Sequence, residues 1–193
     1  MLKDLILKNR SYRRFYEDVP VPLDKLREFI DMARLSASAR NAQSLKYIIS
    51  INPETNKMVF RTLAWAGYLK DWPGPPEGER PSAYIVMLND TSISTNYFCD
   101  DGIAAQSILL CATENGFGGC IIASVNRDEL KKQLNIPDIY KIIQVIALGK
   151  PKEKVVIEKV GKDGDIKYWR DENQVHHVPK RALEDIIIRM ETE

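Results

Sequence analysis

The stretch DGIAAQSILLCATEN, residues 101–115, is the part of the sequence that decides the fold. Its Ala, Ile and Leu residues occupy most positions around a helix, which is typical of a helix buried on most of its sides. Gly116 follows at once and predicts a left-handed cap that ends this helix. An apolar run at 119–123 then predicts a strand. The sequence therefore predicts a central core helix that leads directly into a sheet.

Outward from this helix, helical and extended patterns alternate without a strict strand–helix–strand rhythm. Apolar spacing predicts further helices at 2–8, 22–35, 56–69, 128–134 (capped by Asn126) and 179–190. Apolar runs predict strands at 47–51, 83–88 and 142–148, with an edge strand at 155–160 that pairs with 166–169 as a hairpin. Such a mixture predicts the α+β class, with helices packed on a sheet.

The overall composition excludes several classes of protein. The chain has 193 residues, 44% of them hydrophobic, which fits one domain with a buried core. Its 28 basic and 27 acidic residues give a net charge of +1, so the chain has no general attraction to nucleic acid or to an anionic membrane. Three cysteines without paired spacing argue against a disulfide framework or a zinc site. With no signal peptide or membrane span in the pattern, we expect a soluble protein of a reducing cytoplasm.

A cluster of basic residues at Arg10-Ser11-Tyr12-Arg13-Arg14 is the first candidate binding site. The planar guanidinium matches phosphate oxygens, and a serine hydroxyl adds an uncharged donor. In an extended segment Ser11 and Arg13 would face the same way. Arg14 is expected to be a solvated or structural charge. The alternative interpretation of the whole cluster is a solvated basic turn.

The segment SASARNAQ, residues 36–43, is the second candidate. Its small residues allow a planar ligand to approach the backbone, and Asn41 and Gln43 carry donors and acceptors that match the pyrimidine edge of a flavin. The alternative is an ordinary helix end with polar capping. The glycine-rich GFGGC at 116–120 follows a helix, so it is not a dinucleotide-binding fingerprint. The residues after it, 121–124, remain able to line a ligand with their backbone groups.

In this order, RSYRRF, VPVP, SASARNAQSLKY, the 101–119 helix with its glycine turn, and IALGKP resemble the FMN-dependent nitroreductase family. The resemblance extends from Arg10 to Leu183. It implies an α+β sandwich in which helices flank a mixed or antiparallel central sheet around a long core helix. It also implies one domain over 1–193, a homodimer in which the extension 151–193 contacts the partner, and FMN bound at the dimer interface.

The resemblance transfers site residues position by position. The residues that match the family's flavin contacts are Arg10, Ser11 and Arg13 in its RSxR motif, Ser38, Asn41 and Gln43 in its PSAxNxQPW motif, the backbone of Ile122, Ala123 and Ser124, and either Lys180 or Arg181 near the C-terminus. Arg10 and Arg40 are the candidates for stabilising the anionic reduced flavin. The chain departs from the family at Asn9, where a further arginine is usual, and at Leu45, where the usual tryptophan is missing.

The activity that the resemblance implies is hydride transfer from NADH or NADPH through bound FMN to a nitroaromatic, a quinone or an enone. No catalytic residue of the protein is expected, because the flavin carries the chemistry. Two alternatives stay open: a flavin protein with another role (reductive dehalogenation, flavin destruction or sensing), and a dimeric module without enzymatic activity. The loop 72–80 is read equally well as a substrate lid or as simple loop packing. His176 and His177 are adjacent in a strand and face opposite sides, so no metal site is expected.

Overall fold

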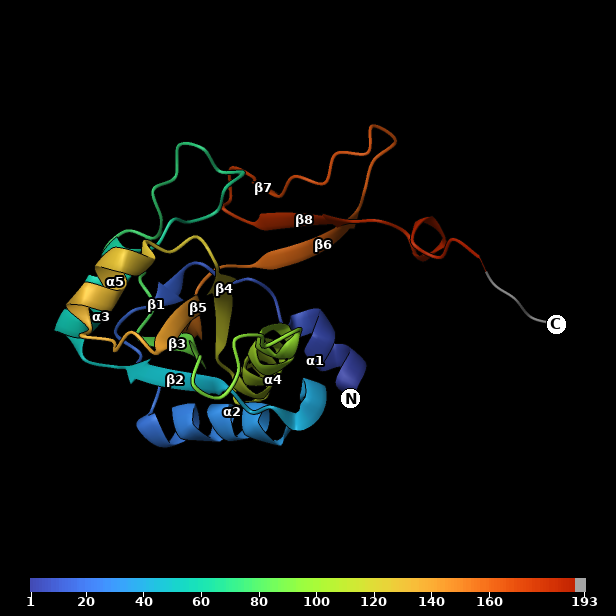
Figure 1. The fold of residues 1–193 in the computed structure, drawn as a ribbon. Helices are drawn as coiled ribbons and strands as arrows, with labels where there is room; N and C mark the ends of the chain where they lie inside the picture. Colours follow the sequence, from blue (N-terminus) through green and yellow to red (C-terminus); the bar gives the residue numbers. More distant parts are fainter. Residues whose placement is uncertain (190–193) are drawn as a thin grey trace. The chain divides into compact units, whose positions relative to one another are not determined.

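The computed structural model describes residues 1–189, which divide into two compact units (Figure 1). The first unit consists of Met1–Trp65 and Trp72–Lys152, and the second of Ala66–Asp71 and the chain from Glu153 onward. Among residues 1–189, no helix is long and apolar enough to cross a membrane.

The first unit is built on a five-stranded antiparallel sheet. Its strands are β1 (Phe15–Tyr16), β2 (Leu45–Ser50), β3 (Ala83–Asp90), β4 (Gly118–Ile122) and β5 (Tyr140–Pro151). The strand order is β1-β5-β3-β2, and β4 also pairs with β5. The long β5 is therefore the centre of the sheet, and β3 beside it is buried along its whole length. The predicted strands at 47–51, 83–88, 119–123 and 142–148 are all present, with slightly different ends.

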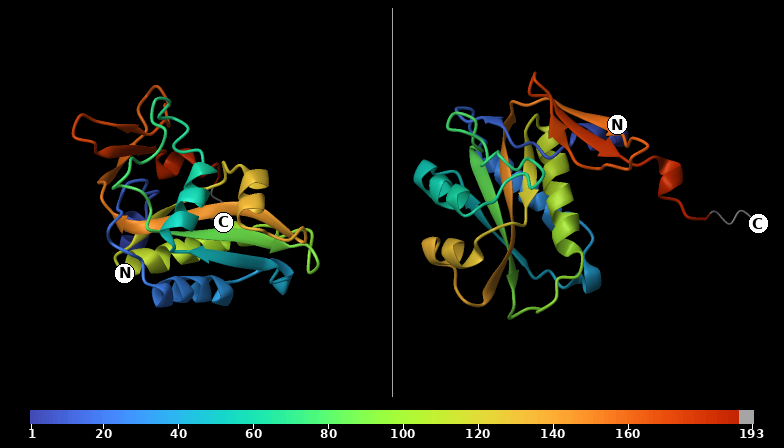
Figure 2. Two further views of the ribbon diagram at one scale, coloured as in Figure 1. Left: turned by 90° about the vertical axis from the view of Figure 1, so that its left-hand side faces the viewer. Right: turned by 90° about the horizontal axis from the view of Figure 1, so that it is seen from above.

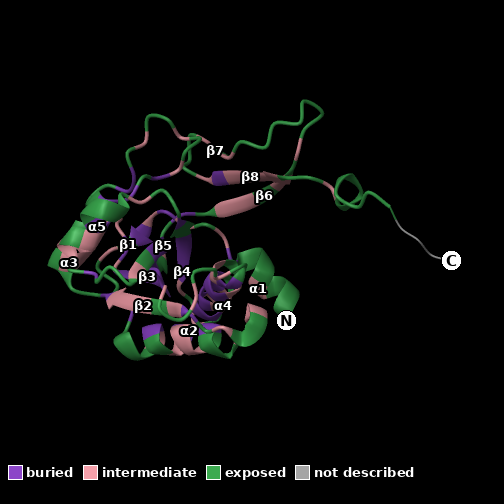
Figure 3. Ribbon diagram, in the orientation of Figure 1, coloured by how far each residue is buried: buried purple, intermediate pink, exposed green. Residues whose placement is uncertain are grey.

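The first unit has five helices: α1 (Leu2–Lys8), α2 (Leu23–Leu35), α3 (Pro53–Arg61), α4 (Asp100–Glu114) and α5 (Arg127–Gln133). Figure 2 shows α2 and α4 on one face of the sheet and α3 and α5 on the other. The α+β class is thus confirmed. The helix α4 is the buried core helix that its composition predicts (Figure 3), and Gly116 ends it with a φ of 77°. Asn126 caps α5 as expected, since its side chain accepts a bond from the Glu129 backbone.

The predicted helix at 56–69 has the wrong ends. The structure starts α3 at Pro53, behind Asn52, whose side chain accepts the backbone N–H groups of Glu54 and Thr55 at 3.0 and 3.1 Å. Asparagine followed by proline is a regular helix start. The helix ends early because Leu63 pairs with Val125 and the chain becomes extended. Trp65 therefore lies outside the helix.

The second unit contains a small sheet in the order β6-β8-β7, made of β6 (Val155–Lys159), β7 (Trp169–Arg170) and β8 (His176–Lys180). The predicted hairpin between 155–160 and 166–169 is wrong, because β6 pairs in parallel with β8 and β7 pairs antiparallel with β8. The predicted helix from Pro179 is also wrong. Pro179 lies in β8 opposite Glu158, and β7 covers only His176 and His177, so one side of β8 is open at the proline that lacks an N–H. A short 3-10 turn at Leu183–Asp185 follows, and the predicted helix end at residue 190 lies outside the described residues.

Candidate functional site

The arginine cluster is extended against the start of β4. The Tyr12 backbone N–H donates to the Gly119 carbonyl at 3.0 Å, and Ser11 forms a parallel bridge with Gly119. A Cβ atom at Gly119 would overlap the Ala147 carbonyl oxygen, and one at Gly118 would lie 2.6 Å from the Tyr12 ring. The glycine turn is therefore what lets the cluster approach the sheet so closely.

The arginines of the cluster have different environments. Arg10 donates from Nη2 to the Ile6 carbonyl at 2.7 Å, while its buried Nε has no hydrogen-bond partner within the described part of the chain. Arg13 is 9% exposed and donates to the Ser11 carbonyl at 3.2 Å, whereas Ser11 itself is exposed. Arg10 thus has an unused donor, as a ligand-binding arginine requires.

Arg14 is held by Glu79 through two hydrogen bonds, from Nε at 2.5 Å and from Nη2 at 2.8 Å. The Lys152 ammonium lies 2.9 Å from the same carboxylate. The Arg14 guanidinium, together with Lys152, lowers the pKa of Glu79 from 4.5 to about 2. Arg14 is therefore a structural charge that fixes the end of the arginine cluster.

The loop 36–44 is anchored on the first residue of α4. Asp100, which is 4% exposed, accepts the Ser38 hydroxyl at 2.6 Å and the Ala39 backbone N–H at 2.8 Å. The carboxylate also lies at a helix N-terminus, where the helix dipole favours negative charge. Asp100 was not among the predicted residues. Only an acidic residue at a helix start pointed to it, and that signal is common.

The backbone of this loop is strained. Arg40, Asn41 and Gln43 have φ values of 56°, 51° and 54°, in the left-handed region that residues with a side chain rarely adopt. Each such residue costs on the order of 1–3 kcal/mol and persists only where the surroundings enforce it. Strain of this kind concentrates at binding and active sites. The loop geometry thus favours the ligand-binding interpretation over an ordinary helix end.

A cavity of about 320 Å³ lies beside the loop. Ser38, Asn41 and Gln43 line it, together with the side chains of β2, α2 and α4. Tyr47 is among them, and burial together with the Asp100 charge raises the pKa of its hydroxyl to about 12. This hydroxyl keeps its proton and is a donor at neutral pH. The cavity therefore combines polar groups at the loop with an apolar side formed by the helices.

Several predicted residues of the first unit do not line this cavity, namely Arg10, Ser11 and Arg13 of the arginine cluster, Arg40, and Ile122, Ala123 and Ser124. Arg40 is exposed, and its guanidinium lies 5.5 Å from the centre of the Phe98 ring. Ile122 is buried in β4, whereas Ala123 and Ser124 are exposed at its end. The carbonyls of Ala123 and Ser124 accept bonds from Val125 and Ala64 of the same unit.

The helix α4 brings the arginine cluster and the loop to one side of the first unit. Asn9, next to the cluster, donates to the Gln106 side chain at 3.4 Å, and Ser38 contacts Asp100. Six residues of helix separate these anchor points by about 9 Å. Lys180 and Arg181 are exposed in the second unit, and their contribution to a common site stays a prediction.

The two adjacent histidines and the loop 72–80 have contacts of their own within the protein. His176 is buried, and His177 lies between Glu158 and Asp171 with its ring stacked 4.1 Å from that of Trp169. Over residues 1–189, no group of three or more His, Cys, Asp or Glu residues is arranged to hold a metal ion. The loop 72–80 is tied down at its end, where the Glu79 carbonyl accepts the Phe15 backbone N–H at 2.9 Å.

Comparison with known proteins bears on the family and the fold of the chain. The model of the nitroreductase family matches residues 6–150. A protein of Bacillus subtilis strain 168, provisionally named NAD(P)H nitroreductase YodC, is 22% identical, and the match covers 76% of this chain and 88% of that protein.

Two solved structures extend the comparison to three dimensions. The FMN-dependent nitroreductase of Clostridium difficile R20291 is 25% identical, with a TM-score of 0.63 over 78% of this chain and 87% of that one. The nitroreductase family protein of Streptococcus pneumoniae TIGR4 is 18% identical and shares the fold, with a TM-score of 0.71 over 98% of this chain and 100% of that one. The family match covers most of the chain and includes both segments anchored on α4. The chain therefore belongs to the nitroreductase family and is an oxidoreductase.

Proposed function

We propose that this protein binds FMN beside the loop 36–44 and transfers hydride from NADH or NADPH to a small organic acceptor. The observation that carries the proposal is the strained loop held by Asp100 next to a cavity that its own side chains line. The FMN-dependent nitroreductase of Clostridium difficile supports the choice of cofactor.

The residues present fit a flavin in two respects. The buried Nε of Arg10 lacks a partner within residues 1–189 and is a donor of the kind that a phosphate or a ring carbonyl requires. Asn41 and Gln43 are exposed on the loop, and the Gln43 amide donates one long bond, of 3.4 Å, to the Asn41 carbonyl. Leu45 is a departure from the family pattern, because it lines the cavity with an aliphatic side chain where a tryptophan is usual.

When bound, FMN would supply the chemistry of hydride transfer between the nicotinamide and an acceptor, which can be a nitroaromatic, a quinone or an enone. The protein's contribution is to bind, to orient and to supply charge. Asp100 holds the loop in its strained form, so that Asn41 and Gln43 are placed before a ligand arrives. Arg10 supplies positive charge that favours an anionic ligand. Ser11, Arg13 and the backbone of 122–124 complete the proposed contacts, with Lys180 or Arg181 on the phosphate.

We also propose that the active form is a homodimer, with the chain after residue 151 on the partner. The second unit exposes four large apolar side chains close together in sequence, namely Leu183, Ile186, Ile187 and Ile188. Such side chains are normally covered in the functional assembly. Light scattering at micromolar concentration tests this state, and a monomer would contradict it.

The binding proposal is tested first by the absorption spectrum of the purified protein and by titration of the flavin-free protein with FMN. The change Arg10→Ala should weaken FMN binding by about 10-fold to 100-fold, because a hydrogen bond to a charged group is lost. The matched control is Arg61→Ala, an exposed arginine at the end of α3, which should leave binding unchanged. Absence of FMN binding by the unmodified protein would refute the proposal.

The role of the loop is tested by Asp100→Ala and Ser38→Ala. The first change leaves the Ser38 hydroxyl and the Ala39 N–H without their acceptor, so FMN affinity should fall more than for Ser38→Ala, which removes one of the two bonds. Circular dichroism controls for folding. Equal affinity in all three proteins would mean that loop geometry does not determine binding.

Stopped-flow reduction tests the activity itself. NADH or NADPH should bleach the flavin absorption, and addition of a nitroaromatic, a quinone or an enone should restore it. If FMN binds and neither nicotinamide reduces it, the protein has another flavin-dependent role, such as sensing.

A further inference from the structure

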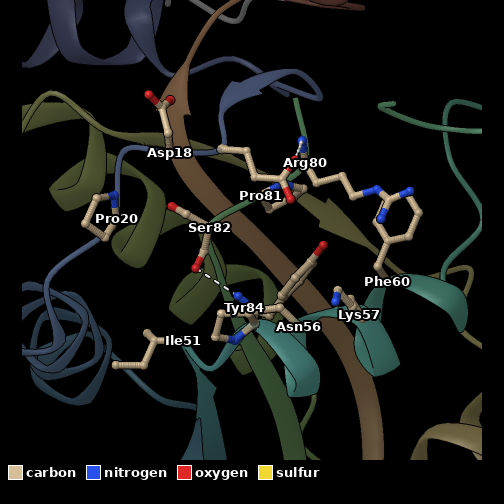
Figure 4. Close-up of a pocket in the computed structure, with 12 residues that line it drawn as sticks. Asp18, Pro20, Ile51, Asn56, Lys57, Phe60, Arg80, Pro81, Ser82 and Tyr84 are labelled. Atoms are coloured by element: carbon tan, nitrogen blue, oxygen red, sulfur yellow. Dashed lines mark hydrogen bonds between the residues drawn. The ribbon is translucent and has the colours of Figure 1, made fainter. Parts of the chain in front are cut away.

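A second pocket in the first unit shares no lining residue with the cavity beside the loop 36–44. Figure 4 shows it in close-up, between the start of β3, the helix α3 and the segment 17–20. Its volume is about 270 Å³, enough for a small organic molecule. Neither the family match nor the proposed hydride transfer gives this pocket a role.

Two buried hydrogen-bond donors at this pocket have no partner among the described residues. They are the Nε of Arg80 and the hydroxyl of Ser82, and the side chain of Tyr84, a residue that is only 1% exposed, lines the same pocket. Buried polar groups in folded proteins are nearly always hydrogen-bonded, so two unpaired ones around one cavity require an explanation. Burial keeps the pKa of Tyr84 well above its ordinary value, and the hydroxyl therefore remains a donor.

Arg80 is the cation at the pocket that is available to an anionic group. Its guanidinium lies 4.5 Å from the centre of the Phe60 ring and makes no ion pair within residues 1–189, whereas the Lys57 ammonium, which also lines the cavity, is paired with Glu54 at 2.9 Å. The Glu17 carboxylate is already occupied, since one oxygen accepts the backbone N–H groups of Gly78 at 2.5 Å and of Arg80 at 3.2 Å. In Figure 4 the carboxylate of Asp18 points away from Arg80.

Part of the wall of the pocket is apolar. This part is formed by Pro20, Ile51, Pro53, Phe60 and Pro81. A hydrated inorganic anion would gain nothing from such walls, whereas an organic body would bury apolar surface there. Figure 4 shows the Tyr84 hydroxyl directed toward the side of the pocket where Arg80 and Phe60 lie. The pocket thus combines the donors of Arg80 and Tyr84 with an apolar wall.

We propose that this pocket binds a small organic monocarboxylate with an aromatic or aliphatic body, whose carboxylate is held by Arg80 and Tyr84. The body of the ligand packs against Phe60 and the prolines, and the Ser82 hydroxyl is a further donor to a substituent. The site is separate from the flavin site, so the protein has a second small-molecule ligand that is neither nicotinamide nor electron acceptor.

The test is an NMR titration of the ¹⁵N-labelled, FMN-supplemented protein with benzoate, and with benzamide as an uncharged analogue of the same shape. Benzoate should cause saturable shifts of the backbone amides of Lys57, Phe60 and Ser82, and benzamide should bind at least about tenfold more weakly because it lacks the charge that Arg80 recognises. No saturable shift at these amides, or equal shifts with both compounds, would overturn the proposal.

Variants assign the effect to the pocket. Arg80→Met should weaken benzoate binding by about tenfold or more, and Tyr84→Phe, which keeps the buried ring, by about threefold to tenfold. The control Arg61→Met removes an exposed arginine from the end of α3, the helix that carries Phe60, and should leave benzoate binding unchanged. FMN binding and nicotinamide-dependent reduction should be the same in all of these proteins, which separates this proposal from that of the flavin site. Benzoate affinity that is unaffected by both pocket variants would refute the assignment.

Discussion

Replacing Glu79 by glutamine should destabilise the protein and remove part of its sensitivity to acid. Arg14 donates two hydrogen bonds to the Glu79 carboxylate and Lys152 contacts it at 2.9 Å, and these groups lower its pKa from 4.5 to about 2. At about 1.36 kcal/mol per pKa unit, this shift corresponds to at most about 3.4 kcal/mol of stability. Lys152 is 37% exposed, so screening by solvent reduces the expected contribution to about 1–2 kcal/mol.

The direction of the pH dependence follows from the lowered pKa. The stabilisation by Glu79 is complete above the unfolded pKa near 4.5 and is lost as the pH falls toward the folded value of about 2. This loss is measured by urea unfolding of the unmodified protein and of Glu79→Gln, each at pH 7 and at pH 3. The difference in unfolding free energy should shrink to less than about half between these two pH values. An equal difference at both would show that the ion pair does not stabilise the fold.

Three further predictions test separate features. Gly119→Ala should destabilise the fold by about 1–3 kcal/mol in urea unfolding, because its Cβ would overlap the Ala147 carbonyl; an unchanged midpoint would mean that the chain adapts without strain. Asn52→Ala removes the cap of α3 and should cost about 1 kcal/mol, measured as a lower thermal midpoint, and no change would contradict the capping role. His177 has a raised pKa because of its bond to Glu158, so its stabilisation is complete below about 6.5 and is lost as the pH rises through the raised value; an NMR titration of the ring that gives a pKa at or below 6.5 would contradict this.

The elements that sequence patterns predict well are those whose burial is uniform. The helix α4 and the strand β3 have apolar side chains on nearly all sides, so composition alone identifies them. The caps at Asn126 and Gly116 are local hydrogen-bond and backbone effects and are equally readable. For these elements the local preference and the tertiary environment agree.

The second unit is where prediction from the sequence fails. The pairing of β6 with β8 joins segments about 20 residues apart in parallel, and no local pattern indicates such a pairing. Proline is common in the first turn of a helix, so Pro179 predicts a helix start. The strand β8 tolerates this proline because β7 pairs only with His176 and His177. In both cases the structure depends on which strand pairs with β8, and local patterns do not indicate this pairing.

The candidate site also has residues that the sequence predicts and one that it does not. The residue types of Arg10, Ser38, Asn41 and Gln43 indicate phosphate and amide recognition, and the structure gives Arg10 an unused buried donor. What the sequence does not reveal is Asp100, because its role depends on the packing of α4 beside the loop. Anchors of this kind come from tertiary contact and have no local signature.

The three left-handed residues of the loop 36–44 set stability and function in opposition. Glycine at Arg40 or Gln43 would relieve the strain in the folded state, so a selection for heat resistance alone would favour it. The same change would remove a side chain from the loop and loosen the backbone that presents Asn41. Laboratory evolution for thermostability should therefore replace residues of this loop early. When activity is selected as well, the positions that keep their residue despite a stabilising alternative would identify the residues that the function requires.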